Sequence, residues 1–414
     1  MSVEAIALIR NKRVVLGVTG SVAAYKAVDL ASKLTQNGAE VNTIMTESAQ
    51  KFVTPLTFQA ITGRPVYTDL WAANTLGLAT HIAHVGLAEA ADLVVIAPAT
   101  ADTLARLAGG FASDLVAITA LGARCPLVIA PAMDGGMYEH PATQENVEKL
   151  RRRGAIIIDP EEGRFASGLS GRGRLPETGT IIGAIRRAFS KNGSLAGKRV
   201  VVTAGGTREP IDPVRYIGNR SSGKQGYALA QAALDAGAEV TLISSVHLPP
   251  PYGAKIIPIE TMRGLLDAVM TASADADLLI MAAAVADFRP QTTADQKIKK
   301  AAANVDSLSL SLIHNEDILE AVKVARQKSG FPRTVIGFAA ESENLLANAR
   351  TKLERKGVDL LVANDISASD AGFSVDTNRV TLLTKDGDEQ LDLMSKTQVA
   401  EIVIERAAGM LVSG

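Results

Sequence analysis

The sequence has little cysteine, little net charge and no long apolar run. Cys125 is the only cysteine among 414 residues, which excludes an internal disulfide and a metal site built from cysteines. The formal net charge of -1 gives no bulk attraction to nucleic acid or to an anionic membrane. The longest apolar run, Leu278 to Ala286, is about half the length that spans a bilayer, and residues 1–10 lack the pattern of a signal peptide. We therefore expect a cytoplasmic protein that binds neither nucleic acid nor membrane.

The length of the chain predicts more than one domain. Hydrophobic residues make up 47% and charged residues 21%, which is the balance of a soluble globular protein. A chain of 414 residues exceeds one ordinary hydrophobic core, so two domains are expected. The segment Ser190–Gly197 is short and polar and contains two glycines, as is typical of a linker. We place the domains at residues 1–190 and 191–414.

One structural plan occurs twice along the chain. A buried-strand pattern leads through a glycine turn into a helical stretch and then into a second strand. These segments are Lys12–Val18, Val22–Gln36 and Ala39–Met45 in the first half, and Lys198–Thr203, Gly226–Asp235 and Gly237–Ile243 in the second. Further apolar segments at 92–97, 126–130, 277–281, 334–337 and 359–362 predict buried parallel strands alternating with helices. The expected fold class is α/β, with two doubly wound, Rossmann-like parallel-sheet domains in series, whose ligands bind beyond the carboxyl ends of the strands.

Three loops in the first half follow such strand ends, at 17–24, 97–102 and 130–138. Glycines in the first loop let the backbone approach an anion, and Ser21 can cap the following helix, whose amino end offers N–H groups to a phosphate. The spacing matches neither G-x-G-x-x-G nor a P-loop, so neither NAD nor ATP is indicated, and a plain tight turn is the alternative. His81 and His84 form a metal pair that lacks a third ligand, and His84 is otherwise an ordinary histidine at a helix start.

The second half carries a longer loop, at 203–226. Its serines and glycines expose N–H donors and Lys224 adds positive charge, so a phosphate is the natural ligand. Gln225 follows the Gly-Lys pair, which excludes a Walker A motif, and a loop that merely caps the helix is the alternative. Farther on, Lys352 and Lys356 lie on one face of a predicted helix, and the charged segment 297–300 is either a mobile loop over phosphates or solvated surface.

These motifs resemble a known family in their order and spacing. The three loops, together with the segment His84–Asp102, are similar to the flavoprotein half of the bifunctional phosphopantothenoylcysteine decarboxylase and phosphopantothenate-cysteine ligase family of bacterial coenzyme A synthesis. The run Thr203–Gly226 is similar to the ligase half of that family. The resemblance spans nearly the whole chain. It implies a flavodoxin-like, FMN-dependent decarboxylase followed by a CTP-dependent ligase.

For the first half, the resemblance implies His84 as the base and a flap at 165–177 that closes over the site on glycine hinges. The family has a proton-donating cysteine where this chain has Ser167, and a serine hydroxyl is a far weaker acid than a thiol, whose pKa is about 8.5. The family also has an asparagine facing the substrate carboxylate where this chain has Asp134. Two carboxylates about 4 Å apart repel by roughly 4 kcal/mol at an effective dielectric near 20, so Asp134 must be protonated, bridged or turned aside. An alternative is therefore an active ligase whose flavin half is a scaffold or is impaired. The residues implied to bind FMN are Gly20, Ser21, Val22, Thr46, Ala97, Pro98, Ala99, Thr100 and Met133.

For the second half, the resemblance implies that phosphopantothenate and CTP form an acyl-cytidylate, which cysteine then converts to the amide. Asn219 is placed at the acyl-nucleotide step and Lys297 at the phosphates, with Mg²⁺ carried by the CTP phosphates. The choice of CTP over ATP rests on the resemblance. A nicotinamide dehydrogenase is disfavoured, because neither first turn has the pyrophosphate fingerprint. The family also implies a homo-oligomer such as a dodecamer. The residues implied to bind CTP are Met281, Ala282, Ala283, Asp287, Lys297, Glu316, Asp317, Ile318, Leu319, Phe338, Lys352 and Lys356.

Overall fold

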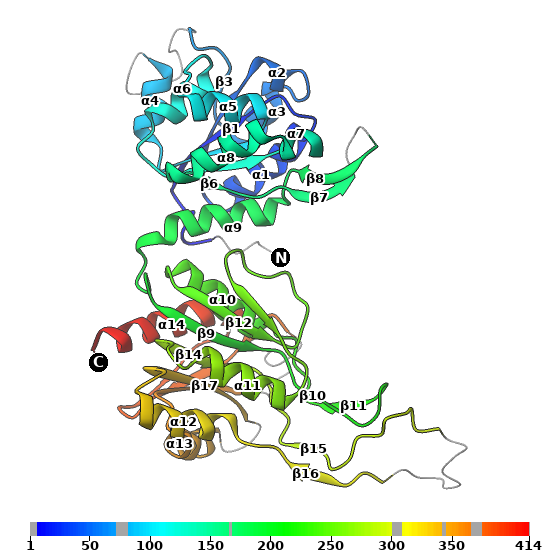
Figure 1. Cartoon of the computed structure of the whole chain (residues 1–414). Coiled ribbons are helices and arrows are strands. Elements are labelled where there is room, and N and C mark those ends of the chain that lie inside the picture. The colour runs from blue at the N-terminus through cyan, green and yellow to red at the C-terminus, as the bar shows by residue number, and fades with distance from the viewer. Residues whose placement is uncertain are drawn as a thin grey trace. The chain divides into compact units, whose positions relative to one another are not determined.

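The structure is a computed structural model and describes residues 6–71, 82–164, 168–299, 309–341, 345–365 and 375–413. The chain divides into two compact units, residues 1–189 and 190–414, which are shown together in Figure 1. Each unit is an α/β fold around its own parallel sheet, so the predicted fold class is confirmed. No helix in these ranges is long and apolar enough to cross a bilayer.

The first unit contains a parallel sheet of six strands in the order β3-β2-β1-β4-β5-β6. The edge strand β3 has only two residues, and the other five strands follow the 2-1-3-4-5 order of flavodoxin-like folds. β4 is buried along its whole length, as expected for a strand covered on both faces. The strands are β1 (Arg13–Val18), β2 (Glu40–Met45), β3 (Val66–Tyr67), β4 (Leu93–Ala99), β5 (Leu127–Pro131) and β6 (Ile156–Ile157).

Helices surround this sheet, and an antiparallel hairpin extends beside it (Figure 1). One core joins Ile96 and Ile129 of the sheet to Leu104 and Val147 of two helices. The hairpin strands are β7 (Glu161–Arg164) and β8 (Ser170–Arg174). The helices are α1 (Ala24–Gln36), α2 (Glu47–Gln50), α3 (Pro55–Thr62), α4 (Ala83–Ala90), α5 (Ala101–Gly109), α6 (Leu115–Gly122), α7 (Gly135–Glu139), α8 (Pro141–Arg152) and α9 (Thr178–Phe189).

The second unit contains a sheet of eight strands in the order β13-β12-β9-β14-β17-β18-β20-β21. Its first six strands are parallel, and β20 and β21 add to the edge in antiparallel pairing. The strands are β9 (Arg199–Ala204), β12 (Glu239–Ser244), β13 (Lys255–Pro258), β14 (Leu278–Met281), β17 (Thr334–Glu341), β18 (Leu360–Asp365), β20 (Val380–Leu383) and β21 (Asp388–Gln390).

Successive side chains of β9 enter two different cores, because a strand turns alternate residues to opposite faces. Val200 and Val202 pack in the core beneath α10 (Lys224–Asp235) and α14 (Lys396–Ser413). Val201 packs in the core beneath three other helices. Those helices are α11 (Met262–Ala272), α12 (Ile318–Ser329) and α13 (Leu345–Lys356). The sheet is therefore covered on both faces.

Three short antiparallel ribbons complete the second unit, and the sequence patterns did not predict them. They place polar loops near the carboxyl ends of the parallel strands. The ribbons are β10 (Arg208–Pro210) with β11 (Tyr216–Gly218), β15 (Phe288–Pro290) with β16 (Leu312–His314), and β19 (Thr377–Asn378) with β22 (Met394–Ser395).

The segment 190–197 is not the free linker that its composition suggested. It begins with a short 3₁₀ helix, η1 (Ser190–Asn192), and the side chain of Leu195 is fully buried in the core beneath α10. The backbone N–H of Leu195 donates to the Ala236 carbonyl at 2.7 Å. Burial of this one leucine outweighs the polar and glycine-rich composition, so the segment belongs to the second unit.

Candidate functional site

In the first unit, the loops after three parallel strands are hydrogen-bonded to one another. The Thr19 hydroxyl donates to the Pro98 carbonyl at 2.8 Å and accepts from the Thr100 N–H at 3.1 Å. The Ala132 N–H donates to the Ala99 carbonyl at 3.0 Å. The FMN candidates that follow β1 and β4 are thus held side by side, together with the loop after β5 that carries Met133.

Two helices at the carboxyl ends of the parallel strands begin with a hydroxyl cap, but Ser21 is not such a cap. Thr46 Oγ1 accepts from the Ala49 N–H at 3.2 Å and caps α2, and Thr100 caps α5 in the same way. Ser21 Oγ instead accepts from the Ala23 N–H at 3.3 Å, and α1 starts at Ala24 without a side-chain cap. The expected cap was wrong because Ser21 stands within the turn, two residues before Ala23, which is the N-cap position of α1.

Gly20 and Val22 occupy the same turn. A Cβ at Gly20 would lie 2.4 Å from Ser48 Cβ, so only glycine lets this turn pack against α2. The Val22 side chain is exposed. Ala97 and Ala99 are fully buried within β4, so they offer backbone atoms rather than side chains to a ligand.

The loop after β5 connects the site to the hairpin. The Met133 N–H donates to the Gly173 carbonyl of β8 at 2.9 Å. Asp134 Oδ1 accepts from the Gly136 N–H at 3.2 Å and caps α7. One carboxylate oxygen of Asp134 is therefore directed to a helix start. Ser167 lies outside the described residues.

His84 is the second residue of α4 and is half-buried. Its Nδ1 is buried and has no hydrogen-bond partner within the described ranges. A buried polar atom without a partner is costly, so this nitrogen fits a site that a ligand completes. His81, the other half of the weak metal pair, lies outside the described residues, and the described chain contains no cluster of three or more potential metal ligands of the His, Cys, Asp or Glu type.

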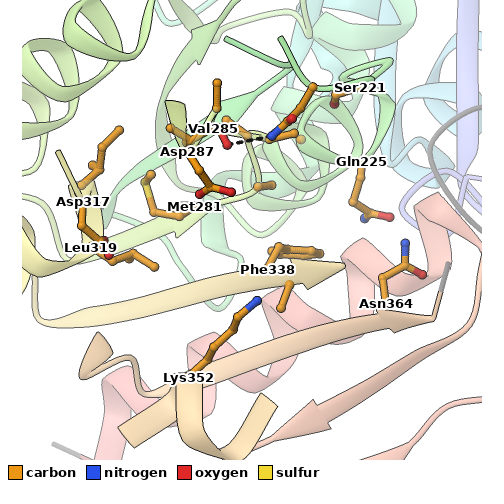
Figure 2. Close-up of a pocket in the computed structure, with 18 of the residues that line it drawn as sticks. Ser221, Gln225, Met281, Val285, Asp287, Asp317, Leu319, Phe338, Lys352 and Asn364 are labelled. Carbon is orange, nitrogen blue, oxygen red and sulfur yellow. Dashed lines mark hydrogen bonds between the residues drawn. The ribbon is translucent and has the colours of Figure 1, made fainter. Parts of the chain in front are cut away.

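The second unit has a cavity of about 920 Å³ at the carboxyl ends of its parallel strands (Figure 2). Asn219 and all the CTP candidates except Lys297 line it. The lining candidates are Met281, Ala282, Ala283, Asp287, Glu316, Asp317, Ile318, Leu319, Phe338, Lys352 and Lys356. The structure thus brings together segments that are far apart in the sequence.

Hydroxyl groups fix the loop that follows β14. Thr203 Oγ1 accepts from the N–H groups of Ala282 and Ala283 at 3.1 and 3.0 Å. The small side chains of this loop leave room in the cavity. Asn219 Nδ2 donates to the Val285 carbonyl at 2.8 Å, as the dashed line in Figure 2 shows. This bond orients the amide and leaves Oδ1 of Asn219 as its acceptor atom for a ligand.

Two helices place charged groups at the other side of the cavity. Asp317 caps α12 through the Glu320 N–H and pairs with the Lys356 ammonium. Burial lowers the pKa of Lys356, and the carboxylate of Asp287 opposes this shift. Figure 2 shows Lys352 pointing toward Phe338. The two lysines of α13 therefore reach one cavity, as their spacing predicts.

Lys297 and Lys224 do not line the cavity. The Lys297 side chain is exposed. The backbone of its neighbour Ile298 donates to Asp212 Oδ2 at 3.2 Å and accepts from the Arg215 guanidinium at 2.7 Å. Lys224 Nζ pairs with Asp376 at 2.6 Å and is likewise absent from the cavity lining.

Several polar lining residues were not identified from the sequence, among them Asn364, Asn378 and Lys396. Asn364 follows the apolar run of β18, so the strand-end rule could have found it. Asn378 and Lys396 follow no parallel strand. The ribbon of β19 with β22 brings them to the cavity, and nothing in the local sequence signals that pairing.

Comparison with known proteins covers both units. The family described as "Flavoprotein" matches residues 4–190, and the "DNA/pantothenate metabolism flavoprotein C-terminal domain" matches residues 195–410. The coenzyme A biosynthesis bifunctional protein of Mycolicibacterium smegmatis is 46% identical, over 97% of this chain and 99% of that protein. The protein of that name from Bacillus subtilis is 43% identical, over 97% of this chain and 98% of that protein.

Among solved structures, the crystal structure of the C-terminal domain of a coenzyme A biosynthesis bifunctional protein is 36% identical. The match covers 54% of this chain and 100% of the solved chain, with a TM-score of 0.45. The curated relatives match this chain from one unit through the other. The chain therefore belongs to the family of bifunctional enzymes of coenzyme A biosynthesis.

Proposed function

We propose that the second unit joins 4′-phosphopantothenate to cysteine at the expense of CTP, and that the first unit decarboxylates the product with FMN to give 4′-phosphopantetheine. The observation that carries the ligase assignment is the cavity of the second unit, which gathers Asn219 and the nucleotide candidates from five separate segments. Membership of the family supports both activities.

The first ligase stage activates the carboxylate of phosphopantothenate. A carboxylate oxygen attacks the α-phosphorus of CTP, the bond to pyrophosphate breaks, and an acyl-cytidylate forms. Lys352 and Lys356 supply positive charge beside the cavity, where oriented charges stabilise the leaving pyrophosphate. Mg²⁺ would accompany the CTP phosphates, since the described residues hold no cluster of potential metal ligands of their own.

The second ligase stage forms the amide. The amine nitrogen of cysteine attacks the acyl carbon, and the carbon–oxygen bond breaks so that CMP leaves with the electron pair. The Asn219 amide, held by Val285 at 2.8 Å, is fixed before the reaction and can orient the acyl phosphate without reorganisation.

In the first unit, the strand-end loops and the unpartnered Nδ1 of His84 fit a flavin and its substrate. A bound FMN supplies the electron sink that the loss of carbon dioxide needs. His84 would exchange a proton with the substrate, and Thr100 and Thr46 would hold the loops at the helix starts. Because the flavoprotein family matches the complete first unit, a mere scaffold is not favoured.

The two half-reactions test the proposal separately. Purified protein should show a flavin absorption spectrum, release pyrophosphate from CTP with phosphopantothenate alone, and form 4′-phosphopantetheine once cysteine is added. ATP in place of CTP tests the nucleotide choice. A protein that ignores added FMN would contradict the assignment of the first unit, and absence of CTP-dependent pyrophosphate would contradict that of the second.

A further inference from the structure

The loop after β14 has no polar side chain with which to fix its own shape. Residues 282–286 read Ala-Ala-Ala-Val-Ala, and they belong to no helix or strand. Ala282 and Ala283 are CTP candidates that line the cavity, as is Asp287 directly after the loop. The shape of residues 282–286, which we call the alanine loop, must therefore come from groups outside it.

Thr203 holds the start of the alanine loop. It is fully buried near the end of β9, on the face where Val201 packs in an apolar core. Its Oγ1 accepts from the N–H groups of Ala282 and Ala283 at 3.1 and 3.0 Å, and its hydroxyl donates to the sulfur of Met281 at 3.9 Å. A hydrophobic residue at this position would leave both N–H groups without that acceptor, which is costly. The loop therefore explains why a hydroxyl occupies a core position.

Thr207 and Asn315 hold the other end of the loop. Thr207 is buried, and its Oγ1 accepts from the Ala286 N–H at 2.9 Å. Asn315 Nδ2 donates to the Ala286 carbonyl at 2.7 Å, and the Asn315 N–H donates to the Asp287 carbonyl at 2.9 Å. The Arg289 guanidinium donates to Asn315 Oδ1 at 3.0 Å, which fixes the orientation of the amide. Both ends of the alanine loop are thus bound to side chains that lie outside it.

A loop of small apolar residues can distinguish one base from another only through the positions of its backbone atoms and the space that it leaves. Hydrogen bonds to a base require donor–acceptor distances of about 2.7 to 3.2 Å, so a small displacement of the loop changes which base fits. A site that hydrogen-bonds a polar group rejects an analogue without that group far more strongly than an apolar surface does. The side chains that hold the loop therefore control the fit of the base.

We propose that Thr203, Thr207 and Asn315 are positioning residues that set the nucleotide selectivity of the ligase by fixing the alanine loop. This inference rests on the proposed ligase function, in which CTP activates a carboxylate. Thr203 and Thr207 do not line the cavity, so they act through the loop rather than on the nucleotide. Loosening the loop should cost CTP more than it costs a nucleotide that the intact loop rejects.

Thr203→Val tests the start of the loop, since valine keeps the β-branched shape and removes the hydroxyl. We expect kcat/KM for CTP, measured as pyrophosphate release with phosphopantothenate, to fall about tenfold or more, because two N–H groups lose their acceptor. The values for UTP and ATP should change less than about threefold, so the preference for CTP falls. This preference is a ratio within each preparation and does not depend on how much protein is folded. Thr203→Ser keeps the hydroxyl and should retain the wild-type preference.

Asn315→Ala tests the other end of the loop, at a partly exposed position. The preference for CTP over UTP should again fall about tenfold, and Thr207→Val should act in the same direction. Thr334→Val is the matched control for both threonines, because Thr334 is buried at the amino end of β17, whereas the cavity lies at the carboxyl ends of the strands. Asn192→Ala, in the exposed part of η1, is the control for the asparagine. Both controls should keep the wild-type preference.

Two outcomes would overturn the inference and leave the ligase function in place. Equal losses for CTP, UTP and ATP in Thr203→Val and Asn315→Ala, or no loss at all, would show that these residues do not set selectivity. A wild-type protein that releases pyrophosphate equally well from all three nucleotides would have no selectivity to set. A wild-type protein that releases pyrophosphate from none of them would instead refute the ligase function, and the inference with it.

Discussion

Asn219 is held by one side-chain contact, the 2.8 Å hydrogen bond from its Nδ2 to the Val285 carbonyl. Asn219→Ala removes the amide without removing a backbone group, so the cavity should keep its shape. We expect pyrophosphate release to continue and amide formation to fall about a hundredfold, since the loss of one oriented polar group at a reacting centre costs that much. Quenched-flow measurement of pyrophosphate and amide in one reaction separates the stages. Unchanged amide yield would contradict the role of Asn219.

Asp212 shows how one buried carboxylate organises a loop. Burial alone would raise its pKa, but hydrogen bonds from the N–H groups of Val214, Ile298 and Arg215 and from the Arg215 guanidinium outweigh burial and hold the pKa of Asp212 well below its usual range.

The resulting pH dependence has a definite sign. The folded pKa of Asp212 lies below the unfolded value, so its contribution to stability is complete above about pH 4 and is lost as the pH falls toward the folded pKa. Asp212→Asn should therefore speed hydrogen exchange at Ile298 about tenfold or more at pH 7, with a smaller difference from wild type below pH 4. Exchange measured by mass spectrometry at several pH values checks this. An effect that grows on acidification would contradict it.

At the scale of elements, α10 lies directly on β9 because of one glycine. A Cβ at Gly226 would lie 2.5 Å from Ala204 Cβ and 2.8 Å from the Thr203 carbonyl oxygen. Gly226→Ala should push the helix from the strand and lower the free energy of unfolding of the second unit by about 1 to 3 kcal/mol, as overpacking does. Urea unfolding measures the change. Gly409→Ala in α14, where a Cβ meets nothing within 4 Å, is the control, and it should be neutral or slightly stabilising.

The strands also differ in how well sequence patterns predict them. Apolar runs such as that of β4 identified all the parallel strands except β3, β6 and β13, because burial on both faces requires continuous hydrophobic residues. The short ribbons escaped notice, since strands of two or three residues have no periodicity to detect. The ion pair of Lys224 with Asp376 could not be predicted either, because the two residues lie 152 positions apart in the sequence.

Over the whole molecule, the two-unit α/β architecture was predictable, and so were many of the residues that line the cavity of the second unit. The strand-end rule explains why Met281 and Phe338 line that cavity. Asn378 and Lys396 were not predictable, because an antiparallel ribbon and the start of the last helix carry them there. Residues brought in by such long-range pairing leave no local signal.

The position of the boundary between the two units predicts how stable fragments of the chain are. Leu195 is fully buried in the second unit and its N–H bonds to Ala236 at 2.7 Å, so residues 190–197 are part of that fold. A fragment 190–414 should unfold cooperatively and release pyrophosphate from CTP, because it retains its own two cores. A fragment 198–414 loses the leucine and should be less stable by about 2 to 5 kcal/mol, the usual cost of emptying such a site. Thermal unfolding of both fragments, with Leu195→Ala in the longer one as the matched control, measures the difference. Equal stability of the two fragments would show that the segment is a linker after all.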